Sequence, residues 1–350
     1  MEQPNNSQNI QQRQARRAAI RKKRQQRKRQ LQLIGLGLAA VLVIILFSIL
    51  LSQCGKNAPT PAQTTQSTES TETSEITEVL ATWQTTPAGR ELTATQHFVY
   101  DCFVDTFLVI PEDADTRIYP ASITKLITAD LALQHLDPQD KITAGEALNL
   151  VAAGSSVADL KKGDTLTVAQ LIGGMILPSG NDAACVLAAA AGRKILGQPT
   201  ADATTAINAF VGKMNEQAQS MGLTNTHFAN ADGIHNEDHY TTYRDLVALA
   251  KQALSNPAIT DYCNVASASL TTAEGRTLQW HNTNLLVDPT SQYYCPYAVG
   301  LKTGQTPYAG SCLLSAFEIN GNTLIVGVFG CPDVESRFAD TLQLLQPFIN

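Results

Sequence analysis

An uncharged, apolar stretch over residues 33–51 constrains this chain of 350 residues more than any other feature. A helix of that length would be about 28 Å long, close to the thickness of a bilayer's hydrocarbon core. Residues 1–30 precede it with ten Lys and Arg residues and a single acid, Glu2. Because positive charge beside an apolar span marks the cytoplasmic side, the pattern predicts a basic cytoplasmic tail (residues 1–30), a transmembrane helix (residues 31–53) and a remainder outside the cytoplasm.

The N-terminal region also permits three other interpretations. A cleaved signal peptide is disfavoured, since its basic region is usually shorter and its apolar core spans only about 7–15 residues. The residues before Cys54 resemble a lipoprotein cleavage box, except that Gln53 stands where a small residue is usual, so lipidation of Cys54 stays open. A basic run can bind nucleic acid, but the adjoining apolar span accounts for it here, and we expect no nucleic-acid partner.

Residues 54–90 differ in composition from the rest of the chain. Thr, Ser, Gln and Glu dominate them, and so few apolar side chains cannot bury enough surface to fold. They predict a disordered linker, and residues 91–350 are then expected to form one extracytoplasmic domain. Beyond residue 30 the chain holds 15 of its 25 bases and 30 of its 31 acids, so the part outside the membrane is acidic.

The chain has seven cysteines, which could form disulfides. Six of them belong to the expected domain: Cys102, Cys185, Cys263, Cys295, Cys312 and Cys331. Disulfides can persist outside the cytoplasm, but the sequence cannot choose among the many pairings of six cysteines. If Gly321-Asn322 is a two-residue hairpin turn, Cys312 and Cys331 face each other across the ladder, whereas a slip in register would remove this pairing. A buried free thiol is as consistent with Cys185, which lies in an Ala-rich helical segment.

Hydrophobic periodicity and helix or turn signals locate the main elements of this domain. A strand or hairpin is expected over residues 97–110, and helices are expected after Pro120, over residues 167–177, and from a cap at Asn181 or Asp182 to residue 196. Later helices are expected near residues 207–221, 242–254 and 333–345, and strands over residues 266–278, 298–303, 310–319 and 323–329. This order predicts an α+β fold in which helices flank an antiparallel sheet.

Three short motifs carry the chemistry: S-I-T-K (residues 122–125), S-G-N (residues 179–181) and K-T-G (residues 302–304). Each is common by chance, but their order and spacing together indicate a serine acyl-transfer site. Ser122 is expected at a helix start, where unpaired N–H groups and the positive helix end favour a developing oxyanion. One helical turn later, Lys125 places its amine beside the Ser122 hydroxyl, and burial that lowers the amine's pKa would make it a base.

The other two motifs suit proton relay and substrate binding. Ser179 and Asn181 lie on a break between two helices, from which a hydroxyl and an amide can project into a cleft. Lys302 and Thr303 offer a charge and a hydroxyl to a carboxylate, and Gly304 lets the substrate backbone approach. Taken singly, the three motifs are as consistent with surface residues, a helix–helix turn and a strand end.

Together with their surroundings, the motifs resemble those of the serine-type D-Ala-D-Ala carboxypeptidases, the low-molecular-mass penicillin-binding proteins. The similar segments are Y-P-A-S-I-T-K-L-I-T (residues 119–128), L-P-S-G-N-D-A-A (residues 177–184), M-G-L-T-N-T-H-F (residues 221–228), H-Y-T-T (residues 239–242) and V-G-L-K-T-G-Q-T (residues 299–306). The resemblance extends over roughly residues 95–345 and implies the β-lactamase/transpeptidase-like fold.

The resemblance also implies a role for each motif residue. Ser122 would be acylated by the penultimate D-Ala of a peptidoglycan stem peptide, with Lys125 as the base and Ser179 as the proton relay. The substrate's amide and carboxylate would be held by Asn181, Lys302, Thr303 and Gly304. Backbone N–H groups of Ser122 and Gln305 would form the oxyanion hole. β-Lactam antibiotics would acylate the same serine, and the reaction would need no metal or other cofactor.

Other functions stay open on the same residues. A serine β-lactamase shares the motifs, but the nearest match to the class A glutamate motif, E-A-L-N (residues 146–149), precedes Ser179 instead of following it. D,D-endopeptidase cleavage of cross-links would use the same site. A zinc peptidase would draw on His227, His235, His239 and Asp232, although the sequence has no H-E-x-x-H helix. A non-catalytic wall-binding module would not need a lysine beside the serine.

Overall fold

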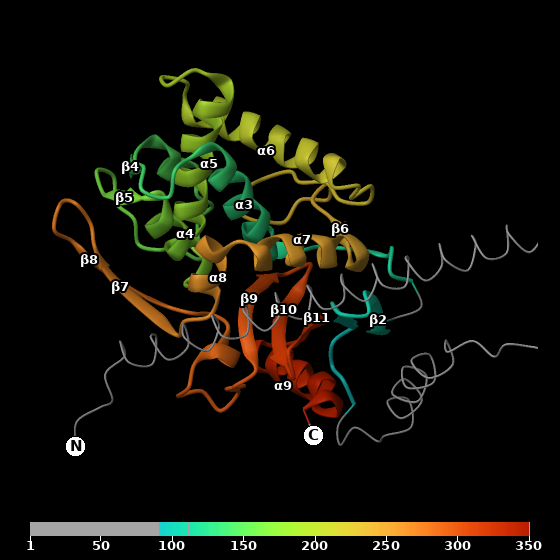
Figure 1. Ribbon diagram of the computed structural model, residues 1–350. Coiled ribbons are helices and arrows are strands. Elements are labelled where there is room, and N and C mark those ends of the chain that lie inside the picture. The colour runs from blue at the N-terminus through green and yellow to red at the C-terminus, as the bar shows by residue number, and fades with distance from the viewer. Residues whose placement is uncertain (1–90, 111–112, 350) are drawn as a thin grey trace, which may run out of the picture. The chain divides into compact units, whose positions relative to one another are not determined.

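The computed structural model describes residues 91–110 and 113–349. The predicted cytoplasmic tail, transmembrane helix and linker lie outside these residues, as does Cys54. Within the described part of the chain, no helix is both long and apolar enough to cross a membrane. The elements that these residues form confirm the α+β class with an antiparallel sheet (Figure 1).

The main sheet has five antiparallel strands in the order β2-β1-β11-β10-β9. The strands are β1 (Gln96–Asp101), β2 (Thr106–Val109), β9 (Ala298–Thr306), β10 (Gly310–Ile319) and β11 (Asn322–Cys331). Helix α9 (Val334–Leu345) packs against β10 and β11, and its apolar side chains share a core with Val99, Leu313 and Val326. Because β9 is an edge strand, the K-T-G motif that it carries lies at the border of the sheet.

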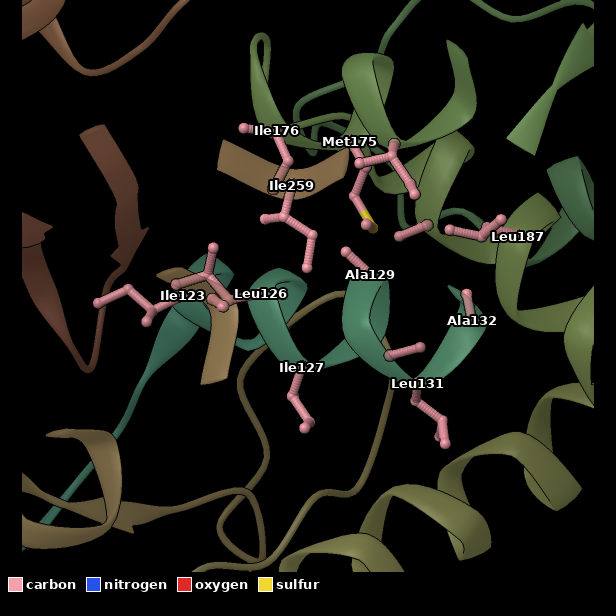
Figure 2. Close-up of a cluster of buried hydrophobic side chains, with 14 of the residues drawn as sticks. Ile123, Leu126, Ile127, Ala129, Leu131, Ala132, Met175, Ile176, Leu187 and Ile259 are labelled. Atoms are coloured by element: carbon pink, nitrogen blue, oxygen red, sulfur yellow. The ribbon is translucent and has the colours of Figure 1, made fainter. Parts of the chain in front are cut away.

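Helix α3 (Lys125–His135) lies at the centre of the helical part of the fold (Figure 1). It contacts α4 (Val168–Ile176), α5 (Asn181–Leu196), α6 (Ala203–Ser220), α7 (Tyr243–Ser255) and α8 (Pro257–Cys263). Figure 2 shows Leu126 and Ala129 of α3 among apolar side chains that include Met175 of α4, Leu187 of α5 and Ile259 of α8. Every residue over 125–132 is buried, so the helix that follows Ser122 is held from several sides.

Side-chain caps start several helices where the sequence predicts them. Thr167 and Gln170 form a reciprocal capping box at α4, Thr242 caps α7, and Asp333 caps α9. Helix α8 is absent from the sequence-based expectations, although it begins with Pro257 at its first position, which is an ordinary start signal.

The predicted strand over residues 266–278 is wrong, because this segment begins a hairpin of two strands, β7 (Ser267–Thr271) and β8 (Thr277–His281). Gly275, with φ of +87°, lies in the turn that divides them. The hairpin projects from the rest of the fold in Figure 1 and is joined to it by Trp280, whose indole N–H donates to the Ala158 carbonyl. Two short strand pairs complete the regular structure: β3 (Arg117–Ile118) with β6 (Thr241–Thr242), and β4 (Lys141–Thr143) with β5 (Thr165–Thr167).

The hairpin between β10 and β11 turns at residues 320–321, one residue earlier than the register that would pair two cysteines. A bulge in β11 shifts the register by one residue further along, and Cys331 lies opposite Ser311, not opposite Cys312. The conditional pairing of Cys312 with Cys331 therefore does not hold. Both are buried free thiols, as is Cys185.

Candidate active site

Ser122 lies in a 3-10 turn, η1 (Ala121–Thr124), directly before α3. The Ile123 N–H donates to the Pro120 carbonyl, and the Lys125 N–H is directed at the carbonyls of Ser122 and Ile123. These bonds continue the turn into α3, so Ser122 stands at the N-terminal end of a helical segment, as predicted. The positive end of the helix dipole therefore faces the nucleophile.

The Lys125 side chain is fully buried and its amine lies beside the serine hydroxyl. Its Nζ atom is 2.9 Å from Ser122 Oγ and 2.7 Å from Asn181 Oδ1, and it also donates to the Asp232 carbonyl. Burial lowers the pKa of the Lys125 amine from 10.5 to about 8, although nearby acidic groups oppose this shift. An amine with this pKa is neutral often enough near neutral pH to accept a proton from Ser122.

The S-G-N motif forms the break between α4 and α5, as predicted. Ser179 is 6% exposed and has a φ of +61°, an uncommon conformation for a residue with a side chain. The prediction that Asn181 or Asp182 caps α5 is wrong: Gly180 is the cap residue and Asn181 is the first helical residue. The Asn181 side chain is instead turned to Lys125, and the Asp182 carboxylate accepts the N–H groups of Ala158 and Leu160.

Strand β9 passes directly against η1 at Gly304. A Cβ atom at Gly304 would lie 3.0 Å from both Ala121 Cβ and the Pro120 carbonyl oxygen, and 3.3 Å from the Ser122 backbone nitrogen. Any side chain there would push the strand away from the nucleophile. The close approach brings the first and third motifs together, and Gln305 is the next residue of β9.

Lys302 is as deeply buried as Lys125, with 1% of its surface exposed. Its Nζ atom lies 3.0 Å from the Thr303 carbonyl oxygen and 3.3 Å from Thr303 Oγ1. Burial lowers the pKa of Lys302 well below its usual value, and the positive charges of Lys125 and Arg337 lower it further. The Thr303 hydroxyl lies 2.7 Å from the hydroxyl of Thr283, a residue outside the three motifs.

These contacts therefore unite residues that are far apart in the chain. Ser122 and Lys125 are neighbours by helical spacing, whereas Asn181 joins them from α5 and Gly304 from β9. Such an arrangement offers a hydroxyl, a buried base, an amide and a buried cation to one ligand.

Sequence comparison identifies the protein family. The profile of the D-alanyl-D-alanine carboxypeptidases (Peptidase_S11) matches residues 83–333. The D-alanyl-D-alanine carboxypeptidase of Streptomyces sp. strain K15 is 36% identical over 241 residues, which are 66% of this chain and 79% of that protein. This chain belongs to the D-alanyl-D-alanine carboxypeptidase family. The expectation of a serine D,D-peptidase is thereby confirmed at the level of the family.

Other members of the carboxypeptidase family match this chain over part or nearly all of their own length. DacF of Bacillus subtilis is 30% identical over 239 residues, and the match spans 57% of that protein. The crystal structure of the Streptomyces K15 DD-transpeptidase superposes with a TM-score of 0.65 and 32% identity, covering 74% of this chain and 97% of that one. Penicillin-binding protein D2 from Listeria monocytogenes, in its ampicillin-bound form, superposes with a TM-score of 0.59 and 27% identity, covering 74% of this chain and 98% of that one.

Arg337 lies beside the K-T-G motif of this family member, although none of the three motifs reveals it. It extends from α9, and its Nη1 atom lies 3.5 Å from the Gly304 carbonyl oxygen. Its guanidinium is buried, its Nε atom has no hydrogen-bond partner, and burial lowers the pKa of Arg337 to about 10. One signal in the sequence could have found it. Arg337 is on the same face of α9 as Thr341 and Leu344, which is the buried face, and a cation is rarely buried without a functional reason.

The three histidines of the zinc-peptidase alternative have separate partners. The His227 ring lies near that of Tyr240, the His235 ring is stacked on that of Tyr308, and His239 contacts the Thr124 hydroxyl. Residues 230–238 form a loop, as predicted. Among residues 91–110 and 113–349, no group of three or more His, Cys, Asp and Glu side chains could hold a metal ion.

Proposed function

We propose that this protein is a serine D,D-carboxypeptidase, which removes the terminal D-Ala of peptidoglycan stem peptides through an acyl-enzyme on Ser122, and that penicillins acylate the same serine. The observation that carries the proposal is the fully buried Lys125 amine, 2.9 Å from the Ser122 hydroxyl. A surface lysine would stay charged near neutral pH, whereas the pKa of about 8 supports a base.

In the acylation step, neutral Lys125 takes the Ser122 proton while Oγ attacks the carbonyl carbon of the penultimate D-Ala. The negative charge that forms on the carbonyl oxygen is stabilised by the N–H groups of Ser122 and Gln305. Loss of one such donor typically costs about 3–4 kcal/mol of barrier. The proton passes from Lys125 through Ser179 to the leaving nitrogen, the C–N bond breaks, and D-Ala departs with a free amino group.

In the deacylation step, a water molecule attacks the ester on Ser122. Lys125 accepts a proton from the water, and the tetrahedral intermediate collapses to the shortened peptide acid as the proton returns to Ser122 Oγ. One base can serve both steps because the second step reverses the proton movements of the first. Asn181 keeps the amine in place by accepting one of its protons.

The terminal carboxylate of the substrate is expected to bind near Lys302, Thr303 and Arg337. Both cations are buried, and the positive charge of Arg337 adds to the burial that lowers the pKa of Lys302. A carboxylate between them would relieve this repulsion and form charge-assisted hydrogen bonds. This arrangement favours substrates that end in a free carboxylate, which includes both stem peptides and penicillins.

The protein is further proposed to be anchored in the cytoplasmic membrane by residues 33–51, with its catalytic domain outside. The support is the basic run before an uncharged span and the polar linker that follows it. Protease added to intact spheroplasts should remove the catalytic domain while the tail stays protected. Protection of the whole chain would contradict this orientation.

The experiment that tests the activity uses the full-length protein, wild type and Ser122→Ala, incubated with a fluorescent penicillin. A stable adduct in the wild type alone supports the proposal, and release of D-Ala from an N-acyl-L-Lys-D-Ala-D-Ala peptide completes it. Rapid turnover of the drug without a lasting adduct would indicate a β-lactamase instead. Release from cross-linked dimers but not from the simple peptide would indicate an endopeptidase, and loss of activity with a chelator would indicate a zinc peptidase.

A further inference from the structure

The peptide group between Ala121 and Ser122 is held from its carbonyl side. Thr124 Oγ1 lies 2.8 Å from the Ala121 carbonyl oxygen and donates to it. The Ser122 N–H, the proposed oxyanion donor, belongs to this same planar group, so a fixed carbonyl also fixes the direction of the N–H. Ala121 has a φ of +48°, which a residue with a Cβ adopts only when its surroundings enforce it.

The hydroxyl of Thr124 is in turn held by His239. The Nδ1 atom of His239 accepts the Ala229 N–H at 3.1 Å, so the proton of the neutral ring is on Nε2. Nε2 lies 2.7 Å from Thr124 Oγ1 and donates to it, which leaves the hydroxyl proton for the Ala121 carbonyl. His239 is 2% exposed, and burial, helped by nearby positive charges, lowers its pKa to about 3, so this one tautomer persists at neutral pH.

Gly233 packs closely against the same peptide group from another side. A Cβ atom at Gly233 would lie 2.0 Å from the Ala121 oxygen and 2.8 Å from the Ser122 nitrogen. Its φ of +84° also favours glycine. The adjacent Asp232 carbonyl accepts a hydrogen bond from Lys125, so the loop that confines the peptide group also holds the base.

We propose that Thr124 and His239 are positioning residues, which aim the Ser122 N–H at the oxyanion through the chain His239 Nε2–H, Thr124 Oγ1–H and Ala121 carbonyl. A hydrogen bond to the carbonyl oxygen also polarises the peptide group and strengthens its N–H as a donor. Neither side chain touches the reacting atoms. The inference rests on the proposed acyl-enzyme function and adds to it the device that holds one half of the oxyanion hole.

A matched pair of variants, Thr124→Val and Thr124→Ser, tests this role in the full-length protein. Valine keeps the shape and loses the hydroxyl, whereas serine keeps the hydroxyl. With a fluorescent penicillin, Thr124→Val should lower the maximal acylation rate about tenfold to a hundredfold, a part of the loss seen when an oxyanion donor is removed. The drug concentration that gives half of the maximal rate should stay unchanged. Thr124→Ser should acylate at close to the wild-type rate.

A second pair of variants, His239→Leu and His239→Gln, alters the histidine end of the hydrogen-bond chain. This pair replaces the first if Thr124→Val does not fold. The leucine variant should slow acylation and the glutamine variant, which retains an N–H donor, should restore much of it. The double variant Thr124→Val/His239→Leu should be no slower than the slower single variant, because both substitutions interrupt the same chain of hydrogen bonds. Equal rates for folded Thr124→Val and Thr124→Ser would overturn the proposal. Absence of any adduct in the wild type would instead refute the function itself.

Discussion

The Nζ atom of Lys125 lies 2.9 Å from the Oγ atom of Ser122, inside a pocket that leaves no part of the lysine side chain exposed. Asn181 Oδ1 and the Asp232 carbonyl oxygen are the amine's two other acceptors. Three oxygens from three segments of the chain thus hold the base before any substrate binds.

Replacement of Lys125 by a side chain that stays charged should slow acylation strongly. In Lys125→Arg the guanidinium stays protonated at any ordinary pH and cannot accept the Ser122 proton. We expect the rate of acylation by a fluorescent penicillin to fall about 10²–10⁴-fold, the usual contribution of a general base. The exposed Lys162→Arg is the matched control and should react like the wild type. A reactive Lys125→Arg would exclude lysine as the base.

The pH dependence of acylation should report the buried amine. Because the base acts only when neutral and its pKa is about 8, the rate should rise about tenfold per unit as pH increases toward 8, then level off. The second-order rate constant with a penicillin, measured in stopped-flow experiments over this range, gives the midpoint. A midpoint near 10.5, the ordinary value for lysine, would show that burial does not tune this group.

Gly304→Ala should separate β9 from the nucleophile. The new methyl group would meet Ala121 Cβ and the Pro120 oxygen at 3.0 Å, closer than such contacts normally come. We expect acylation to slow about tenfold or more, because the Gln305 N–H would be displaced and loss of an oxyanion donor costs about 3–4 kcal/mol of barrier. In Gly212→Ala, the control within α6, a Cβ atom meets nothing within 4 Å, and helix propensity should raise stability by about 0.5–1 kcal/mol. Normal acylation by Gly304→Ala would contradict the close approach.

Arg337→Met should weaken binding of the substrate carboxylate more than it affects folding. Loss of a charge-assisted hydrogen bond is worth about 1.5–3 kcal/mol, so KM for a D-Ala-D-Ala peptide should rise about tenfold or more. The melting temperature should not fall much, because a buried cation with an unpartnered Nε atom is replaced by an apolar chain of similar length. Arg244→Met, which breaks an exposed ion pair with Asp115, is the control and should leave KM unchanged.

Short-range signals in the sequence were sufficient for much of the fold. Thr167 and Asp333 begin helices where their cap signals predict, and strand β10 has the predicted bounds. The spacing of Ser122 and Lys125 predicted their contact, because residues three apart on a helical turn are neighbours. These features depend on a few consecutive residues, so the chain's local chemistry specifies them.

The tertiary structure decided what the sequence left open. Asn181 was expected to be a possible cap and instead binds Lys125. The turn at residues 320–321 displaces the register that would have paired Cys312 with Cys331, and a bulge in β11 offsets this displacement only in part. Arg337, which is 35 residues after Lys302 in the sequence, contacts the Gly304 carbonyl from α9, and no motif marks it. The sequence by itself determined the reactive groups, their family and the local elements that carry them. Their convergence, and the burial that lowers the pKa of Lys125, arise only from packing between segments far apart in the chain, which no local pattern encodes.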